Sequence, residues 1–182
     1  MEVGALEIRF ASHDDLSDIA RVNVDVWQST YRGLMSDDFL DSLSYDASRE
    51  RFARMLSRTD TPSFVVAADT GDGIVGYAHA GASRERSLAP DIDGELYGLY
   101  LLPSYHRQGV GRKLVKAAAT ELAERGYRSM VVVVFTDNQN GRQFYEAMGA
   151  KPLIERIAGI RGEFVKELLY VFEDVTEVGM KG

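Results

Sequence analysis

The sequence of 182 residues contains no cysteine, which excludes disulfide bonds, thiolate metal ligands and a cysteine nucleophile. It also has no apolar run approaching the roughly 18 residues that a membrane-spanning helix needs. The first ten residues, MEVGALEIRF, lack the basic and apolar regions of a signal peptide. These absences predict a cytoplasmic protein that has no membrane partner.

Positive charge is scarce as well. The chain has 21 basic and 28 acidic residues and a formal net charge of −7. Such a chain is a poor match for nucleic acid, whose phosphates attract basic surfaces, so no nucleic-acid partner is expected. The three histidines, His13, His79 and His106, have no metal-ligand spacing, and we therefore predict no metal site.

The hydrophobic pattern predicts a mixed α/β protein with a central sheet. Alternating or continuous apolar runs indicate strands. Longer helical patterns cover residues 12–31, residues 36–57 with a break near SLSYD, and two later segments. No repeat or Pro/Ser-rich linker interrupts the order, so a single domain spanning residues 1–182 is expected. The predicted strands are LEIRFA, SFVVAAD, IVGYAHAGA, ELYGLYLL, MVVVVF, LIERIAGI and EFVKELLYVFED.

One glycine cluster imitates a dinucleotide-binding motif. Gly71, Gly73 and Gly76 match G-x-G-x-x-G, but that fold needs a helix to begin there. The following residues, YAHAGAS, alternate as a strand does, so TGDG is predicted to be a hairpin turn. The chain also lacks the Walker motif G-x-x-x-x-G-K-[ST]. An enzyme that uses ATP or a dinucleotide is therefore disfavoured.

A second glycine cluster does precede a helical pattern. Gly109 and Gly111 stand at its start, where backbone N–H groups lack intrahelical partners and carry partial positive charge. Without a Cβ, both glycines leave room for a phosphate to approach the backbone. The alternative is a glycine turn that only lets helix and strand pack closely. The motif by itself leaves both alternatives open.

Two stretches around this helix carry a family resemblance. LYLLPSYHRQGVGRKLV resembles the acyl-CoA signature Q/R-x-x-G-x-G/A of the GNAT superfamily of N-acetyltransferases, with His106 at the place usually held by Gln or Arg. FTDNQNGRQFYEAMGA is similar to the family's later motif. The resemblance covers nearly the whole chain. It implies the GNAT fold, an α/β (α+β) architecture with a central mixed, mostly antiparallel sheet of about seven strands flanked by about four helices.

The resemblance also implies an enzyme, one that transfers an acetyl group from acetyl-CoA directly to a primary amine of a small molecule or peptide. In this family the splayed strand offers backbone groups to the pantetheine arm, and the following helix holds the pyrophosphate. The matching cofactor-binding residues are Leu99, Tyr100, Leu101, Arg107, Gln108, Gly109, Val110, Gly111 and Arg112, with Asn138 and Asn140 from the later motif.

Three residues are candidates for proton transfer. Tyr145 matches the family position of the general acid that protonates the leaving thiolate; its alternative role is packing. Glu95 and Tyr97 alternate along one strand and share a face, where either could relay the amine proton, directly or through water. A base is useful because an amine of pKa about 10.4 is neutral in only about one molecule in 10³ at pH 7. For Glu95 the alternative is a solvated carboxylate at the strand edge.

The acceptor pocket is less specified. The resemblance points to Trp27 and Tyr31, whose aromatic faces suit a cationic amine, with Asp37 and Asp38 nearby. The alternative assigns the aromatic residues to the core and the aspartates to a helix cap. Another function on the same fold is a noncatalytic acyl-CoA-binding sensor or scaffold, which would not need Tyr145. The apolar strand ELLYVF is compatible with pairing across a homodimer or with the core.

Overall fold

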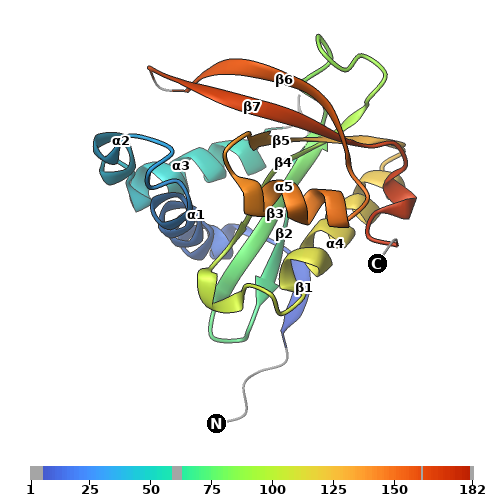
Figure 1. Ribbon diagram of the computed structural model, residues 1–182. Coiled ribbons are helices and arrows are strands. Elements are labelled where there is room, and N and C mark those ends of the chain that lie inside the picture. The colour runs from blue at the N-terminus through green and yellow to red at the C-terminus, as the bar shows by residue number, and fades with distance from the viewer. Residues whose placement is uncertain (1–5, 59–62, 161, 181–182) are drawn as a thin grey trace. The chain divides into compact units, whose positions relative to one another are not determined.

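The computed structural model describes residues 6–58, 63–160 and 162–180 (Figure 1). Within these residues, seven strands form one sheet in the order β1-β2-β3-β4-β5-β7-β6. β4 and β5 are parallel, whereas the pairs β1–β2, β5–β7 and β6–β7 are antiparallel, so the predicted mixed sheet is confirmed. The strands are β1 (Glu7–Phe10), β2 (Ser63–Asp69), β3 (Ile74–Ala82), β4 (Gly94–Leu101), β5 (Met130–Phe135), β6 (Lys151–Ile160) and β7 (Glu163–Phe172).

The helical region expected after residue 36 is two helices. The Ser36 hydroxyl accepts the Phe39 N–H at the start of the first, and the Ser44 hydroxyl accepts the Ala47 N–H at the start of the second. A second cap therefore begins a new helix at the break that SLSYD indicates. The helices of the described chain are α1 (Leu16–Thr30), α2 (Asp37–Asp41), α3 (Tyr45–Leu56), α4 (Val110–Glu124) and α5 (Gln139–Ala147). None of them combines the length and apolar character needed to cross a membrane.

The chain forms two compact units. Of the described residues, the first unit comprises 6–58, 63–79 and 99–117, and the second comprises 80–98, 118–160 and 162–180. The backbone passes from one to the other within β3, β4 and α4. Each unit has its own cluster of buried apolar side chains.

The first unit is built by packing α1 and α3 on β2 and β3 (Figure 1). Apolar residues recur along α1 at helical spacing, so one stripe of the helix faces the strands. Burying these side chains stabilises the unit by roughly 25 cal/mol per Å² of apolar surface. The cluster contains Leu16, Ile19, Val22, Val26, Phe52, Val65, Ala67, Ile74 and Tyr77.

The second unit centres on β5, whose sequence is MVVVVF. Most of its residues are buried, and β4 and β7 pair with its two edges, as expected for a β-branched run inside a sheet. β7 is in turn paired with β6, and Leu169 to Phe172 at its end are buried. The stretch ELLYVF therefore belongs to the core and has no free strand edge. Within this unit the edge strand is β6.

The imitation dinucleotide motif is a hairpin turn, as predicted. Gly71 and Gly73 have φ angles of 85° and 136°, and the Asp69 carboxylate accepts the Gly71 N–H at 2.8 Å. β3 follows directly. Gly76 allows close strand packing, because a Cβ there would lie 2.9 Å from the Tyr100 carbonyl oxygen and 2.6 Å from the Leu101 side chain.

Candidate active site

The start of α4 has the geometry of an anion-binding helix terminus. Gly109 precedes the helix with a left-handed φ of 78°, a conformation that favours glycine. Its carbonyl oxygen accepts the Lys113 N–H at 3.1 Å, so the N–H groups of Val110 and Gly111 come before the first intrahelical bond. Apart from Gly109 and its two chain neighbours, no atom of the described residues lies within 4 Å of the position that a Gly109 Cβ would take. The space beside this backbone is open, which is compatible with the approach of a phosphate oxygen.

Side chains hold the loop that leads into α4. His106 Nε2 lies 2.9 Å from the Leu101 carbonyl oxygen, and Gln108 Nε2 donates to the Ser104 carbonyl oxygen at 2.7 Å. Because a carbonyl only accepts, His106 carries its proton on Nε2. The loop also contains a left-handed residue that is not glycine, Arg107, with a φ of 58°. His106 thus makes a side-chain bond to the end of β4 from the position usually held by Gln or Arg.

The part of β4 that lies in the first unit is fixed by packing. The rings of Tyr77 and Tyr100 lie 5.1 Å apart, and Tyr100 packs against the buried cluster of that unit. Beyond the strand, the Leu102 N–H donates to the Val75 carbonyl oxygen at 2.9 Å. The backbone of Leu99 to Leu101 is therefore held by its neighbours before any ligand arrives.

Glu95 lies on β4 in the second unit and is only 1% exposed. Its carboxylate accepts the Arg84 backbone N–H at 2.7 Å and Arg84 Nη2 at 2.7 Å, with Arg84 Nε at 3.2 Å. This burial corrects the alternative of a solvated strand-edge carboxylate. Glu95 therefore has a cationic partner, Arg84, at 2.7 Å.

Tyr97, two residues along the same strand, keeps its own proton. Its hydroxyl donates to the Ala82 carbonyl oxygen at 2.6 Å, and the Arg84 guanidinium lies 4.1 Å from the ring centroid. Burial, and secondly the charge of Glu95, raise the pKa of Tyr97 to about 12. Near neutral pH the phenol therefore cannot serve as a base.

The later motif begins α5 in the second unit. Asn138 is the N-cap, and its side-chain oxygen accepts the Gly141 N–H at 3.0 Å, a structural role that the sequence comparison with the family did not indicate. Asn140 is exposed in the first turn. Tyr145 is 7% exposed, with its ring 5.2 Å from that of Phe144. This burial is compatible with both roles considered for Tyr145.

Trp27 and Tyr31 lie in the first unit as part of an aromatic cluster. Their ring centroids are 4.6 Å apart, and Phe39 of α2 is 6.0 Å from Trp27. Both residues are half-buried. The Asp37 carboxylate accepts Arg32 Nη1 at 2.8 Å, so its charge already has a partner. The aromatic faces remain the better candidates for contact with an acceptor.

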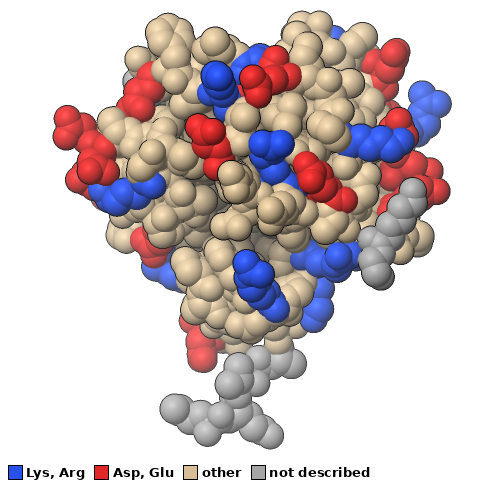
Figure 2. All heavy atoms as spheres, in the orientation of Figure 1, with Lys and Arg blue, Asp and Glu red and all other residues tan. Residues whose placement is uncertain are grey.

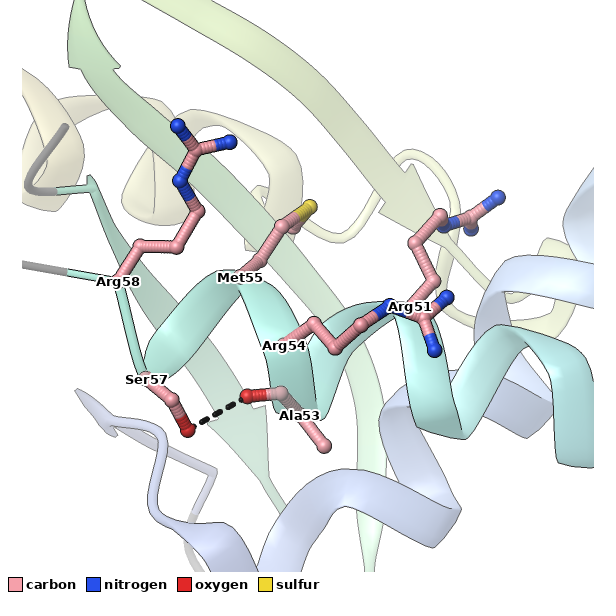
Figure 3. A pocket seen from close by; sticks show the side chains of 6 residues that line it. All are labelled: Arg51, Ala53, Arg54, Met55, Ser57 and Arg58. Carbon is pink, nitrogen blue, oxygen red and sulfur yellow. Dashed lines mark hydrogen bonds between the residues drawn. The ribbon is translucent and has the colours of Figure 1, made fainter. Parts of the chain in front are cut away.

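A surface depression elsewhere in the first unit contains none of the predicted site residues (Figure 3). Arg51, Arg54, Met55 and Arg58 line it near the end of α3, and the Ser57 hydroxyl donates to the Ala53 carbonyl oxygen beside it. Arg51 also donates to the Asn23 side chain at 2.7 Å. The depression is therefore a feature of the surface at the end of α3.

Charged side chains of both signs are spread over the surface in Figure 2. Basic and acidic side chains are interspersed over the face that Figure 2 shows. Among the described residues, no group of three or more His, Asp or Glu side chains is arranged to hold a metal ion.

Comparison with known proteins identifies the class. The family model "Acetyltransferase (GNAT) family" matches residues 27–150, and the chain belongs to this family. An uncharacterized N-acetyltransferase of Bacillus subtilis (strain 168), YuaI, is 37% identical over 157 residues, covering 85% of this chain and 87% of that protein. The prediction of an enzyme that transfers an acetyl group from acetyl-CoA is confirmed by these relationships.

Two further similarities come from Thermoplasma acidophilum. A spermidine N(1)-acetyltransferase is 24% identical over 169 residues, covering 91% of this chain and 98% of that protein. The crystal structure of PaiA N-acetyltransferase in complex with coenzyme A has a TM-score of 0.70 and 22% identity, covering 90% of this chain and 98% of that one. The second similarity supports the GNAT fold predicted from the sequence.

Proposed function

We propose that the two units act as one acetyltransferase domain, residues 1–182, which transfers an acetyl group directly to a primary amine of a small molecule or peptide. The observation that carries this proposal is the start of α4, where a left-handed Gly109 leaves open space beside helix N–H groups. The absence of cysteine supports direct transfer, because no thiol is present to carry the acetyl group. The reaction is placed in the cytoplasm, without a membrane or nucleic-acid partner.

Different residues would bind different parts of acetyl-CoA. The backbone of Leu99 to Leu101 would hold the pantetheine arm and polarise the acetyl carbonyl, and the first turn of α4 would hold the pyrophosphate. Arg107 and Arg112 add positive charge near that turn, with Gln108 in the loop before it. In the second unit, Asn140 and the amide nitrogen of Asn138 supply further contacts. Acetyl-CoA contributes an activated thioester, so the protein mainly needs to align the two reactants.

Protons follow two routes in this proposal. Tyr145 would protonate the leaving thiolate. The amine proton is best assigned to water, since Glu95 is bonded to Arg84 and Tyr97 retains its phenolic proton. Glu95 would then act by fixing the β3–β4 loop, and Tyr97 by packing against Arg84. Trp27 and Tyr31 would offer aromatic faces to the ammonium group of the acceptor before it loses its proton.

Calorimetric titration with acetyl-CoA tests the cofactor site. A Gly109→Glu variant places a negative side chain in the open space and should weaken binding at least about tenfold. The matched control is Gly71→Glu, because Gly71 has a φ of 85° and equally open surroundings in the hairpin turn. Both variants carry similar backbone strain of about 1–2 kcal/mol. Equal affinities in the two variants would contradict the proposed pyrophosphate site.

Catalysis is tested in the same preparation by release of free thiol with a panel of amines. Tyr145→Phe keeps the ring but removes the acid, and should lower kcat about 10²-fold while acetyl-CoA still binds. A rate close to that of the unmodified protein would show that Tyr145 has only a packing role. Acetyl-CoA binding without thiol release for any amine would favour the noncatalytic sensor or scaffold.

A further inference from the structure

Two side chains, Glu95 and Tyr97, hold Arg84 in place. Its Nε and Nη2 atoms donate to the buried carboxylate of Glu95, and its backbone N–H donates to the same group. Its guanidinium also stacks on Tyr97, 4.1 Å from the ring centroid. Tyr97 is itself anchored by its bond to the Ala82 carbonyl. The orientation of the guanidinium is therefore set before any ligand binds.

The opposite edge of this guanidinium has no hydrogen-bond partner among the described residues. Glu95 occupies the edge formed by Nε and Nη2, whereas Nη1 makes no hydrogen bond within the described residues. The Arg84 side chain is 62% exposed, although its partner Glu95 is 1% exposed. A guanidinium has five N–H donors in a planar fork, so the edge formed by Nη1 and Nη2 can still bind a carboxylate with two parallel bonds.

The charges around Arg84 determine which anion suits it. The adjacent residue, Glu85, is bonded to Arg156 at 2.5 and 3.0 Å, and Arg156 also binds Glu167 at 2.9 Å. These three carboxylates, Glu95 included, exceed the two guanidinium groups by one. Attraction must therefore come from directed hydrogen bonds more than from net charge. That favours a singly charged carboxylate over a doubly charged phosphate.

Sequence position connects Arg84 to the proposed chemistry. It is bonded to Glu95 and stacked on Tyr97, both of which lie on β4, the strand whose continuation supplies Leu99 to Leu101. We propose that Arg84 binds a carboxylate of the amine acceptor through its Nη1–Nη2 edge, which makes amino acids or peptides the preferred acceptor class. This inference rests on the proposed acetyltransferase function and adds the substrate class.

The test uses pairs of acceptors that differ by one carboxylate. Suitable pairs are L-lysine with cadaverine, L-phenylalanine with phenethylamine, and a dipeptide with its C-terminal amide, all at constant ionic strength. The quantity measured is the ratio of kcat/KM within each pair, from release of free thiol. The unmodified protein should favour the carboxylate member of at least one pair about 10- to 100-fold, the effect of a charge-assisted hydrogen-bonded contact.

Variants of Arg84 connect that ratio to the residue. Arg84→Gln should bring the ratio close to one, and Arg84→Lys should restore it only in part, since an ammonium cannot make both contacts. Arg86→Gln, in the same exposed loop, is the matched control and should keep the ratio. Because Arg84→Gln leaves Glu95 buried without a cation, the double variant Arg84→Gln/Glu95→Gln is measured as well, and it should also lose the preference.

The outcomes separate this inference from the function on which it rests. No preference in the unmodified protein, or a preference that persists in both Arg84→Gln and the double variant, overturns the carboxylate site while thiol release still supports acetyl transfer. An equal loss with Arg86→Gln also overturns it, because general loop charge would then explain the effect. No thiol release with any amine would remove the proposed function itself.

Discussion

The two units bury their polar groups in different ways. In the first unit, Asn23 lies between α1, α3 and β3 and bonds mainly to neutral groups. Its amide nitrogen donates to the Tyr77 hydroxyl at 2.8 Å, and its oxygen accepts the Ser48 hydroxyl at 3.1 Å and Arg51 Nη2 at 2.7 Å. In the second unit the corresponding bonds are ion pairs, Arg84 with Glu95 and Arg156 with both Glu85 and Glu167.

The difference predicts how much stability each unit loses when one residue of its network is removed. A neutral network loses about one hydrogen bond and the desolvation cost of the orphaned group when a member is removed. An ionic network that loses its cation leaves a charge in a poorly solvated place, which costs more. Burial also raises the pKa of Tyr77 well above its usual value, so the Tyr77 hydroxyl keeps its proton across the physiological range.

The largest effect is expected from Arg156→Ala in the second unit. It leaves the Glu85 and Glu167 carboxylates, whose side chains are 13% and 9% exposed, without their cation. The free energy of unfolding should fall by about 3 kcal/mol, measured by urea denaturation. The control is Arg54→Ala, whose exposed contact with Glu50 is 3.7 Å and should matter by less than about 0.5 kcal/mol. Similar losses of stability in both variants would show that the buried ion pairs of Arg156 contribute no more than an exposed ion pair.

A smaller effect is expected from Tyr77→Phe in the first unit. The substitution keeps the buried ring and removes the acceptor of the Asn23 amide, so unfolding should become easier by about 2 kcal/mol. Tyr45→Phe is the matched control, because its hydroxyl donates to Asp25 at the surface and its loss should cost little. If Tyr77→Phe proves neutral, the buried network contributes nothing beyond packing.

The smallest effect concerns an ion pair of the first unit, Arg9 with Asp15. Hydrogen bonds from Arg9, opposed in part by burial, lower the pKa of Asp15 to about 2, below the value of 3.8 expected when unfolded. The folded state is thus stabilised above pH 4, and this contribution is lost as the pH falls toward 2. With Arg9 partly exposed, about 1 kcal/mol is expected.

Asp15→Asn provides the measurement for that pair. Unfolding curves of both proteins between pH 2 and 6 should differ at the upper end and converge at the lower end. Parallel curves across the range would show that ionisation of Asp15 does not contribute.

Local chemistry made most of the fold predictable. The strands, the helix after Gly109, the break near SLSYD and the turn at TGDG all depend on residues a few positions apart. The motif around Gly109 and Gly111 could be recognised for the same reason, since a helix start and the glycines beside it are local features of the sequence. The family and its reaction followed from these motifs and were confirmed.

The tertiary structure decided what the motif residues touch. The hairpin register brings Arg84 to Glu95, eleven positions away, and the fold brings Arg156 to Glu85 across 71 positions. No spacing in the sequence predicts either contact, because both contacts depend on the path that the intervening chain takes in the fold. The sequence by itself determined the elements and the family of this protein. Only the tertiary structure decided that Glu95 is a bonded, buried carboxylate, because burial and partners come from segments that local patterns cannot align.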